Sequence, residues 1–191
     1  MKLDSCSLGF RVKSGWAAVV FLGGPRKTPR LIETRIVALS DPAVPHARQP
    51  YHAGFGTAQR NAAKVARLVQ GIERFSRRAI AKLVAGYREE HQVARAGVVV
   101  ASLTDPATIT NPHMRAHASE GRLFRTVLID GLQRCGIGVE VILERDAFES
   151  LAEALRCPPH AAKARVAELG TAADHWRAEQ KVAAAAAWLV R

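Results

Sequence analysis

The N-terminal stretch SLGFRVKSGWAAVVFLGG places two apolar segments on either side of a short Lys-Ser-Gly connection. Residues 8–12 and 16–22 are typical of strands, and a tight glycine-containing connection between them predicts a hairpin. Residues 31–39 mix apolar and β-forming side chains before Asp41-Pro42 ends the run. We therefore expect a meander of three antiparallel strands, which commits the chain to a sheet at its start.

After this meander the pattern alternates between helix and strand. Residues 41–56 contain three prolines and two glycines without periodicity, which is typical of a connector or of a lid. Apolar residues then recur every three or four positions, which predicts a long helix over residues 57–88 with Thr57 as its N-cap. The continuous apolar run at 96–102 predicts a strand that is buried on both faces.

A second helix is predicted from Asn111-Pro112, because asparagine is a good N-cap and proline suits the first helical position. It extends to about residue 136, a strand follows at 138–143, and residues 146–191 form two or three helices. This order predicts an α/β fold with a mixed five-stranded sheet, in which three antiparallel strands are followed by parallel crossovers between flanking helices. We expect a core over 1–145 and a helical C-terminal extension over 146–191 packed on it.

Two short segments near the N-terminus are similar to a known sequence motif. LGF at 8–10 and SGWAAVV at 14–20 are similar to the two ends of a motif that reads Gly-Ile-Asp-Pro-Gly, a few residues, then Thr-Gly-Trp or Thr-Gly-Tyr and an apolar strand. The chain thereby resembles the ribonuclease H-like superfamily, and within it the RuvC-type Holliday-junction resolvases. The resemblance covers the order of elements over about residues 8–143 and implies a nuclease-like fold.

The resemblance also implies a pair of metal ions held by carboxylates, and here the chain departs from the family. Arg11 occupies the position that matches the carboxylate of the first strand. Residues 98–102 offer no carboxylate, and Glu179 alone represents the acidic pair of the last helix. Two neighbouring divalent ions need several oxygen ligands to offset their repulsion. We therefore expect a degenerate metal site that does not support two-metal hydrolysis.

The chain carries a net charge of +11, from 28 Lys and Arg against 17 Asp and Glu. Such an excess indicates either a polyanionic partner or simply an arginine-rich composition. On a helical projection of the long helix, six cations fall within one narrow arc opposite the apolar residues. These six, named here the basic row, are Arg60, Lys64, Arg67, Arg74, Arg78 and Lys82.

We expect the basic row to contact the phosphate backbone of a nucleic acid, with no distinction between DNA and RNA. The alternative is an ordinary solvated helix face. Arg11 and Lys13 lie at the hairpin turn, where they either add phosphate contacts or remain at a solvated tip.

The segment His113-Met-Arg-Ala-His117-Ala-Ser-Glu120 places two imidazoles and a carboxylate on one helical face. Histidines one turn apart can chelate a transition metal, which makes His113, His117 and Glu120 candidate ligands. Two alternatives stay open: an anion bound near His113 at the helix N-terminus, or a polar face in which Glu120 pairs with Arg122 or a neighbour. We expect no cofactor apart from this divalent metal.

The remaining features bear on location and function class. The chain has three cysteines and no CxxC pair. The apolar run GWAAVVFLGG after Arg11 and Lys13 weakly resembles a signal peptide, but the run is short, no small-residue cleavage site follows it, and no segment is long enough to span a membrane. We expect a cytoplasmic protein without a membrane partner. The predicted function is a non-catalytic nucleic-acid-binding or scaffold protein. The alternatives are a metal-dependent hydrolase or nuclease that uses the histidine face, and a homo-oligomer that associates through its alanine-rich C-terminal helix.

Overall fold

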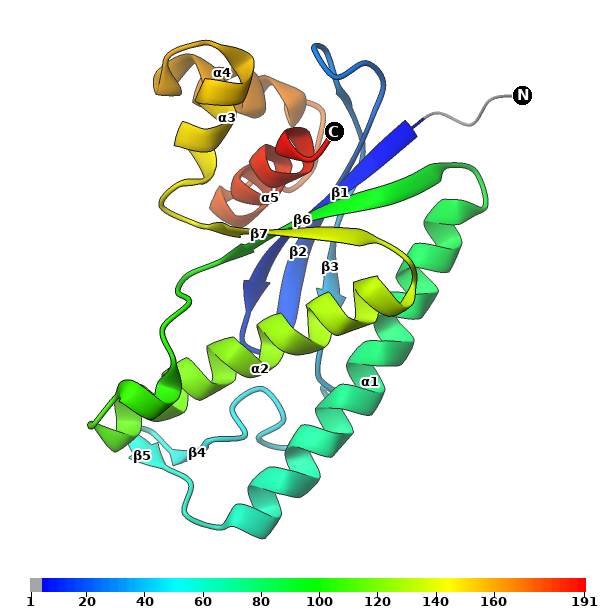
Figure 1. Cartoon of the computed structure of the whole chain (residues 1–191). Coiled ribbons are helices and arrows are strands. Elements are labelled where there is room, and N and C mark those ends of the chain that lie inside the picture. The colour runs from blue at the N-terminus through cyan, green and yellow to red at the C-terminus, as the bar shows by residue number, and fades with distance from the viewer. Residues whose placement is uncertain (1–4) are drawn as a thin grey trace.

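The computed structural model describes residues 5–191 and is built around one twisted five-stranded sheet (Figure 1). The first three strands, β1 (Ser5–Lys13), β2 (Trp16–Gly23) and β3 (Arg30–Ala38), form the expected antiparallel meander. Strands β6 (Gln92–Val100) and β7 (Gly138–Leu143) then continue the sheet parallel to β1, in the order β3-β2-β1-β6-β7. The predicted α/β class and mixed sheet are confirmed.

Helices α1 (Ala62–Arg88) and α2 (Pro112–Arg134) cover one face of the sheet, as Figure 1 shows. Alternate side chains of a strand point to the same face of the sheet, and Leu8, Phe10 and Val12 of β1 all lie in the core that α1 and α2 cover. Phe124 of α2 and Ile80 of α1 are fully buried in that core. The main core therefore lies between the sheet and the α1–α2 pair.

The other face of the sheet is covered by α5 (Ala178–Leu189), with α3 (Ala147–Leu155) and α4 (Pro159–Leu169) packed around it. Helix α5 lies unusually close to the strands because glycines stand beneath it. A Cβ atom at Gly9 would lie 1.8 Å from the carbonyl oxygen of Ala183, and one at Gly97 would lie 2.6 Å from that of Ala186.

This packing corrects one expectation. Ala183 to Ala187 of α5 are fully buried against the chain's own sheet, so these five alanines are not available as an interface, and homo-oligomerisation through another surface stays a prediction. The division of the chain at residue 145 stays a prediction, although α5 packs directly on the sheet.

The long helix begins later than predicted. Asn61, and not Thr57, is its N-cap, and the side chain of Asn61 accepts a hydrogen bond from the backbone N–H of Lys64. The residues before it form a small hairpin of β4 (His52–Gly54) and β5 (Thr57–Ala58), which the sequence pattern did not predict. Two- and three-residue strands are too short to leave a periodic signal.

The second helix begins where it was expected. The Asn111 side chain accepts hydrogen bonds from the backbone N–H groups of His113 and Met114, and Pro112 occupies the first helical position. A short 3-10 turn, η1 (Pro106–Thr108), precedes it and is capped by Asp105. These local contacts position the histidine-bearing end of α2.

Candidate functional site

The carboxyl ends of β1, β6 and β7 lie at the same edge of the sheet, because the three strands are parallel. Ligands of open α/β sheets commonly bind at this edge. Arg11 lies near the end of β1, where it pairs with Val99 of β6. It shares a face with Ser7 and Gly9, which lie under α5. Arg11 thus lies at the edge of the sheet where the resemblance implies a metal-binding carboxylate.

Arg11 is not exposed at a turn, contrary to the expectation of a phosphate contact there. Arg11 is only 3% exposed, and its side chain forms a two-point ion pair with Glu144, the residue that follows β7. Arg11 Nε donates to Glu144 Oε1 at 3.0 Å, and Nη1 donates to the carbonyl of Val12. Paired N–H donors that match both carboxylate oxygens give a strong and well-oriented contact.

A second ion pair lies at the same edge of the sheet. Lys13 Nζ is 3.7 Å from Oε1 of Glu179, the first-turn acidic residue of α5. Both carboxylates near the end of β1 therefore face a cation of their own chain. Across the described residues 5–191, they do not join a group of three metal-ligating side chains.

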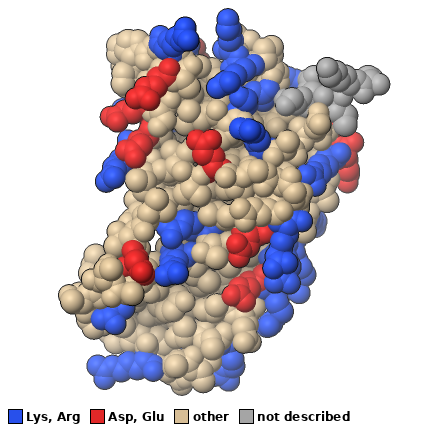
Figure 2. Space-filling view, viewed as in Figure 1, with Lys and Arg blue, Asp and Glu red and all other residues tan. Residues whose placement is uncertain are grey.

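The basic row keeps five of its six members on α1. Arg60 precedes the helix, so its place in the helical arc was wrong. Of the others, Lys64 is half-buried and the remaining four are exposed; none of the five forms an ion pair with a described residue. Figure 2 shows Lys and Arg side chains along the outer edge of the molecule over α1. The nucleic-acid role of the row stays a prediction.

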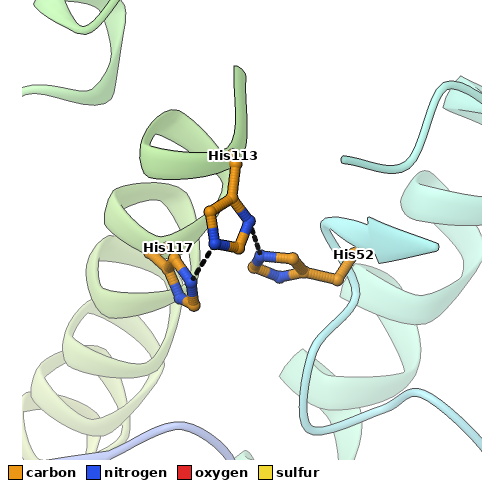
Figure 3. A group of neighbouring side chains, drawn as sticks. All are labelled: His52, His113 and His117. Atoms are coloured by element: carbon orange, nitrogen blue, oxygen red, sulfur yellow. Dashed lines mark hydrogen bonds between the residues drawn. The ribbon is translucent and has the colours of Figure 1, made fainter. Parts of the chain in front are cut away.

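Three histidines meet between β4 and α2 (Figure 3). His113 and His117 lie one turn apart on α2, as the spacing predicted, and point toward His52 of the β4–β5 hairpin. Nε2 of His52 is 3.2 Å from Nδ1 of His113, and the Nε2 atoms of His113 and His117 are also 3.2 Å apart. One ring nitrogen from each histidine can be chosen such that all three lie within 4.8 Å of one another.

Glu120 has a different place from the one predicted. Its residue is 1% exposed, and its Oε1 lies 2.7 Å from Nδ1 of His52. It therefore contacts the back of the His52 ring instead of joining the three histidines. It also does not pair with Arg122, which instead contacts Asp105 at 3.2 Å.

Burial shifts the titration of two of these groups. Burial raises the pKa of the Glu120 carboxyl above its ordinary value, and the hydrogen bond to His52 acts against that rise. Partial burial, followed by the charges of His52 and His113, lowers the pKa of His117. Burial thus favours the uncharged form of each of these two groups, whereas the hydrogen bond to His52 favours the Glu120 carboxylate.

A cavity of about 770 Å³ opens beside the three histidines. Its walls come from residues 41–49, the β4–β5 hairpin and the first turns of α2. Arg48 lines it and donates a hydrogen bond to the backbone carbonyl of Ser14, which ties this segment to the β1–β2 turn. The histidine cluster therefore faces an open volume and is not sealed in the core.

Sequence reasoning missed His52. This residue lies in the segment that was expected to be an unpatterned connector or lid, and no spacing links it to α2. It is 61 residues from His113 along the chain. Only the packing of the hairpin against α2 brings the two side chains together.

The fold has close structural parallels. The chain superposes on T. thermophilus RuvC in complex with a Holliday junction substrate with a TM-score of 0.58 and 12% sequence identity, over 97% of this chain and 91% of that one. A second Thermus thermophilus RuvC structure gives a TM-score of 0.56 and 12% identity, over 96% and 91% of the two chains. The chain thus has a ribonuclease H-like fold of RuvC type, and the expected fold resemblance is confirmed.

No family model and no curated protein matches the sequence of the chain. Within residues 5–191, none of the helices combines the length and the apolar character that crossing a membrane requires.

Proposed function

We propose that this RuvC-type chain is a nucleic-acid-binding protein that holds the phosphate backbone with α1 and does not cut it at the carboxyl edge of its sheet. The observation that carries the proposal is the ion pair between the buried Arg11 and the partly exposed Glu144. It stands where the resemblance implies a carboxylate for divalent metal. The similar RuvC structure in complex with a Holliday junction supports nucleic acid as the class of partner.

The ion pair opposes metal binding at this edge for an electrostatic reason. A guanidinium keeps its charge at any accessible pH, so Arg11 places a fixed positive charge beside Glu144. A divalent cation bound to Glu144 would have to displace that guanidinium from its partner. Lys13 opposes metal binding to Glu179 in the same way.

Helix α1 supplies the surface for binding. The five members of the row on α1 present their charges without carboxylate partners among the described residues, in contrast to Arg11 and Lys13. A rigid row of cations suits a regularly spaced line of phosphates. No aromatic side chain is part of the row, so we expect binding with little dependence on base sequence.

The test is a salt titration of binding. Fluorescence anisotropy with labelled duplex DNA, a four-way DNA junction and duplex RNA is measured between about 50 and 300 mM salt. If five cations contact phosphates, the logarithm of affinity falls against the logarithm of salt with a slope of about 4.5. Binding that is absent or insensitive to salt contradicts the proposal.

Two neighbouring arginines on α1 give a matched pair of variants. Arg78→Ala removes a member of the row, whereas Arg77→Ala removes an exposed cation that lies about 100° away around the helix. We expect Arg78→Ala to lower the salt slope by about 0.9. Arg77→Ala should leave the slope unchanged, and equal effects of the two variants would count against a defined row.

A cleavage assay tests the other half of the proposal. Purified protein is incubated with the same nucleic acids in Mg²⁺ or Mn²⁺, and the products are separated on denaturing gels. We expect no cleavage above a protein-free control. Cleavage that is lost in Glu144→Gln or Glu179→Gln would show that the carboxyl edge is catalytic.

A further inference from the structure

We propose that His52, His113 and His117 bind one divalent transition-metal ion of the zinc class, with Glu120 as the residue that positions His52. This inference is independent of nucleic-acid binding by α1, because it concerns a different set of residues. It replaces the ligand set expected from the sequence, in which Glu120 was the third ligand. The proposal rests on ligand chemistry, on distances and on the buried carboxylate behind the cluster.

The distances suit a small tetrahedral ion. Zinc binds histidine nitrogen at about 2.0–2.1 Å, so two nitrogens at neighbouring corners of the tetrahedron lie about 3.3 Å apart. Nε2 of His52 and Nδ1 of His113 are 3.2 Å apart, close to that edge length. One nitrogen of each histidine can be chosen so that all three lie within 4.8 Å of one another. His117 contacts Nε2 of His113 and not Nδ1, so its exposed side chain would rotate toward Nδ1 when a single ion is held.

Glu120 gives His52 a defined orientation. A carboxylate hydrogen-bonded to Nδ1–H of a histidine fixes the ring and leaves Nε2 as the free ligand atom, an arrangement common behind metal-bound histidines. In this chain Oε1 of Glu120 lies 2.7 Å from Nδ1 of His52, and both side chains are buried. Nε2 of His52 is consequently the atom that points toward His113 and His117.

The donor set selects the class of metal. Three imidazole nitrogens favour zinc and its transition-metal neighbours, whereas magnesium and calcium prefer oxygen ligands. Three protein ligands leave one position of a tetrahedral ion open. The cavity beside the histidines provides room for water or another oxygen ligand at that position.

A metal-free explanation also accounts for the short contacts, and it makes a different prediction. His117 can donate to His113, His113 to His52, and His52 to Glu120, so that one chain of hydrogen bonds satisfies all three rings. In that case zinc would bind no better than to an isolated surface histidine. Metal affinity therefore distinguishes the two explanations.

The experiment uses tag-free, chelator-treated full-length protein and Zn²⁺ in competition with a chromogenic chelator. We expect one tightly bound zinc per chain. His117→Ala, which removes an exposed ligand at little risk to folding, should weaken binding by at least 100-fold. His160→Ala is the matched control, because His160 is exposed at the start of α4 and lies outside the cluster.

Glu120→Gln tests the positioning role. The amide oxygen can still accept from His52, but the negative charge is gone, so we expect about 10-fold weaker zinc binding. Cobalt(II) provides the spectroscopic measurement, since a tetrahedral site gives intense visible bands. Those bands should persist, shifted, in Glu120→Gln and disappear in His117→Ala.

Three results would overturn the proposal. The first is less than one tenth of an equivalent of zinc retained by the folded wild-type protein. The second is zinc affinity in His117→Ala equal to that in His160→Ala. The third is a cobalt spectrum typical of six-coordinate hydrated ion, which would show that the histidines do not enclose the metal.

Discussion

The carboxyl edge of the sheet and the histidine cluster show two ways in which one chain can treat a potential metal site. At the sheet edge, Arg11 and Glu144 are oppositely charged and joined at two points, with the Arg11 side chain buried and the Glu144 side chain partly exposed. Between β4 and α2, the side chains of His52, His113 and His117 carry nitrogen donors that face one another and an open cavity. In the first arrangement a cation of the chain already occupies the carboxylate, whereas in the second the three imidazoles contact one another beside a cavity that can admit a ligand.

The contrast between the sheet edge and the histidine cluster shows that the fold and the chemistry of a site are set by different parts of the chain. The parallel strands β1, β6 and β7 bring their carboxyl ends together whatever side chains they carry, and in this chain the edge that they form holds the Arg11–Glu144 ion pair. The histidine cluster depends on the short hairpin and on the first turns of α2, which lie in the helical layer on the other face from Arg11. The likeness in fold therefore fixes the arrangement of strands and helices, and the chemistry of each site has to be read from this chain's own side chains.

The largest expected effect concerns the two members of the ion pair. Glu144→Gln should destabilise the protein by about 3 kcal/mol, because it leaves the buried charge of Arg11 without its partner. Arg11→Met should cost less, about 1 kcal/mol, because the Glu144 side chain is 42% exposed and can be hydrated. Chemical denaturation measures both, with Glu140→Gln as an exposed control on β7. Equal costs, or a greater cost for Arg11→Met, would show that the burial of the Arg11 charge does not determine the stability of the pair.

The next largest expected effect is stabilisation of the folded protein by zinc, and we expect it to depend on the histidine cluster and not on the Arg11–Glu144 pair. At a free concentration one hundred times the dissociation constant, a bound metal stabilises the folded state by about 2.7 kcal/mol. For a chain of this size that corresponds to a rise in Tm of roughly 5–10 °C. We expect the same rise in wild type and Glu144→Gln and none in His117→Ala, as measured by calorimetry. A smaller rise in Glu144→Gln would show that the two regions are coupled.

The smallest expected effect is on the salt slope of nucleic-acid binding, and it distinguishes a cation in an ion pair from a cation without one. Lys13 faces Glu179, so Lys13→Ala should leave the salt slope of nucleic-acid binding unchanged. Lys82 is exposed on α1 without an ion-pair partner among residues 5–191, and Lys82→Ala should lower that slope by about 0.9. Anisotropy titrations of both variants make the comparison. A loss of slope in Lys13→Ala would show that the sheet edge also meets phosphate.

Local patterns in the sequence determined most of the architecture. The hairpin connection, the apolar runs and the Asn111-Pro112 start of α2 depend on neighbours a few residues away, and the structure confirms the element order that they predict. The shared face of His113 and His117 follows from helical spacing alone. The start of α1 was misplaced because Thr57 and Asn61 are both acceptable caps, and pairing of Thr57 with β4 decided between them.

Tertiary structure alone decided which side chains meet. Arg11 and Glu144 are 133 residues apart, and His52 and Glu120 are 68 apart, so no periodicity connects either pair. Their contacts depend on how strands align at an edge and how a hairpin packs against a helix. Amino-acid periodicity reports which face of an element is buried, but it carries no signal for the partner across that face. For this reason the sequence determined the framework and the histidine pair on α2, and packing determined both sites.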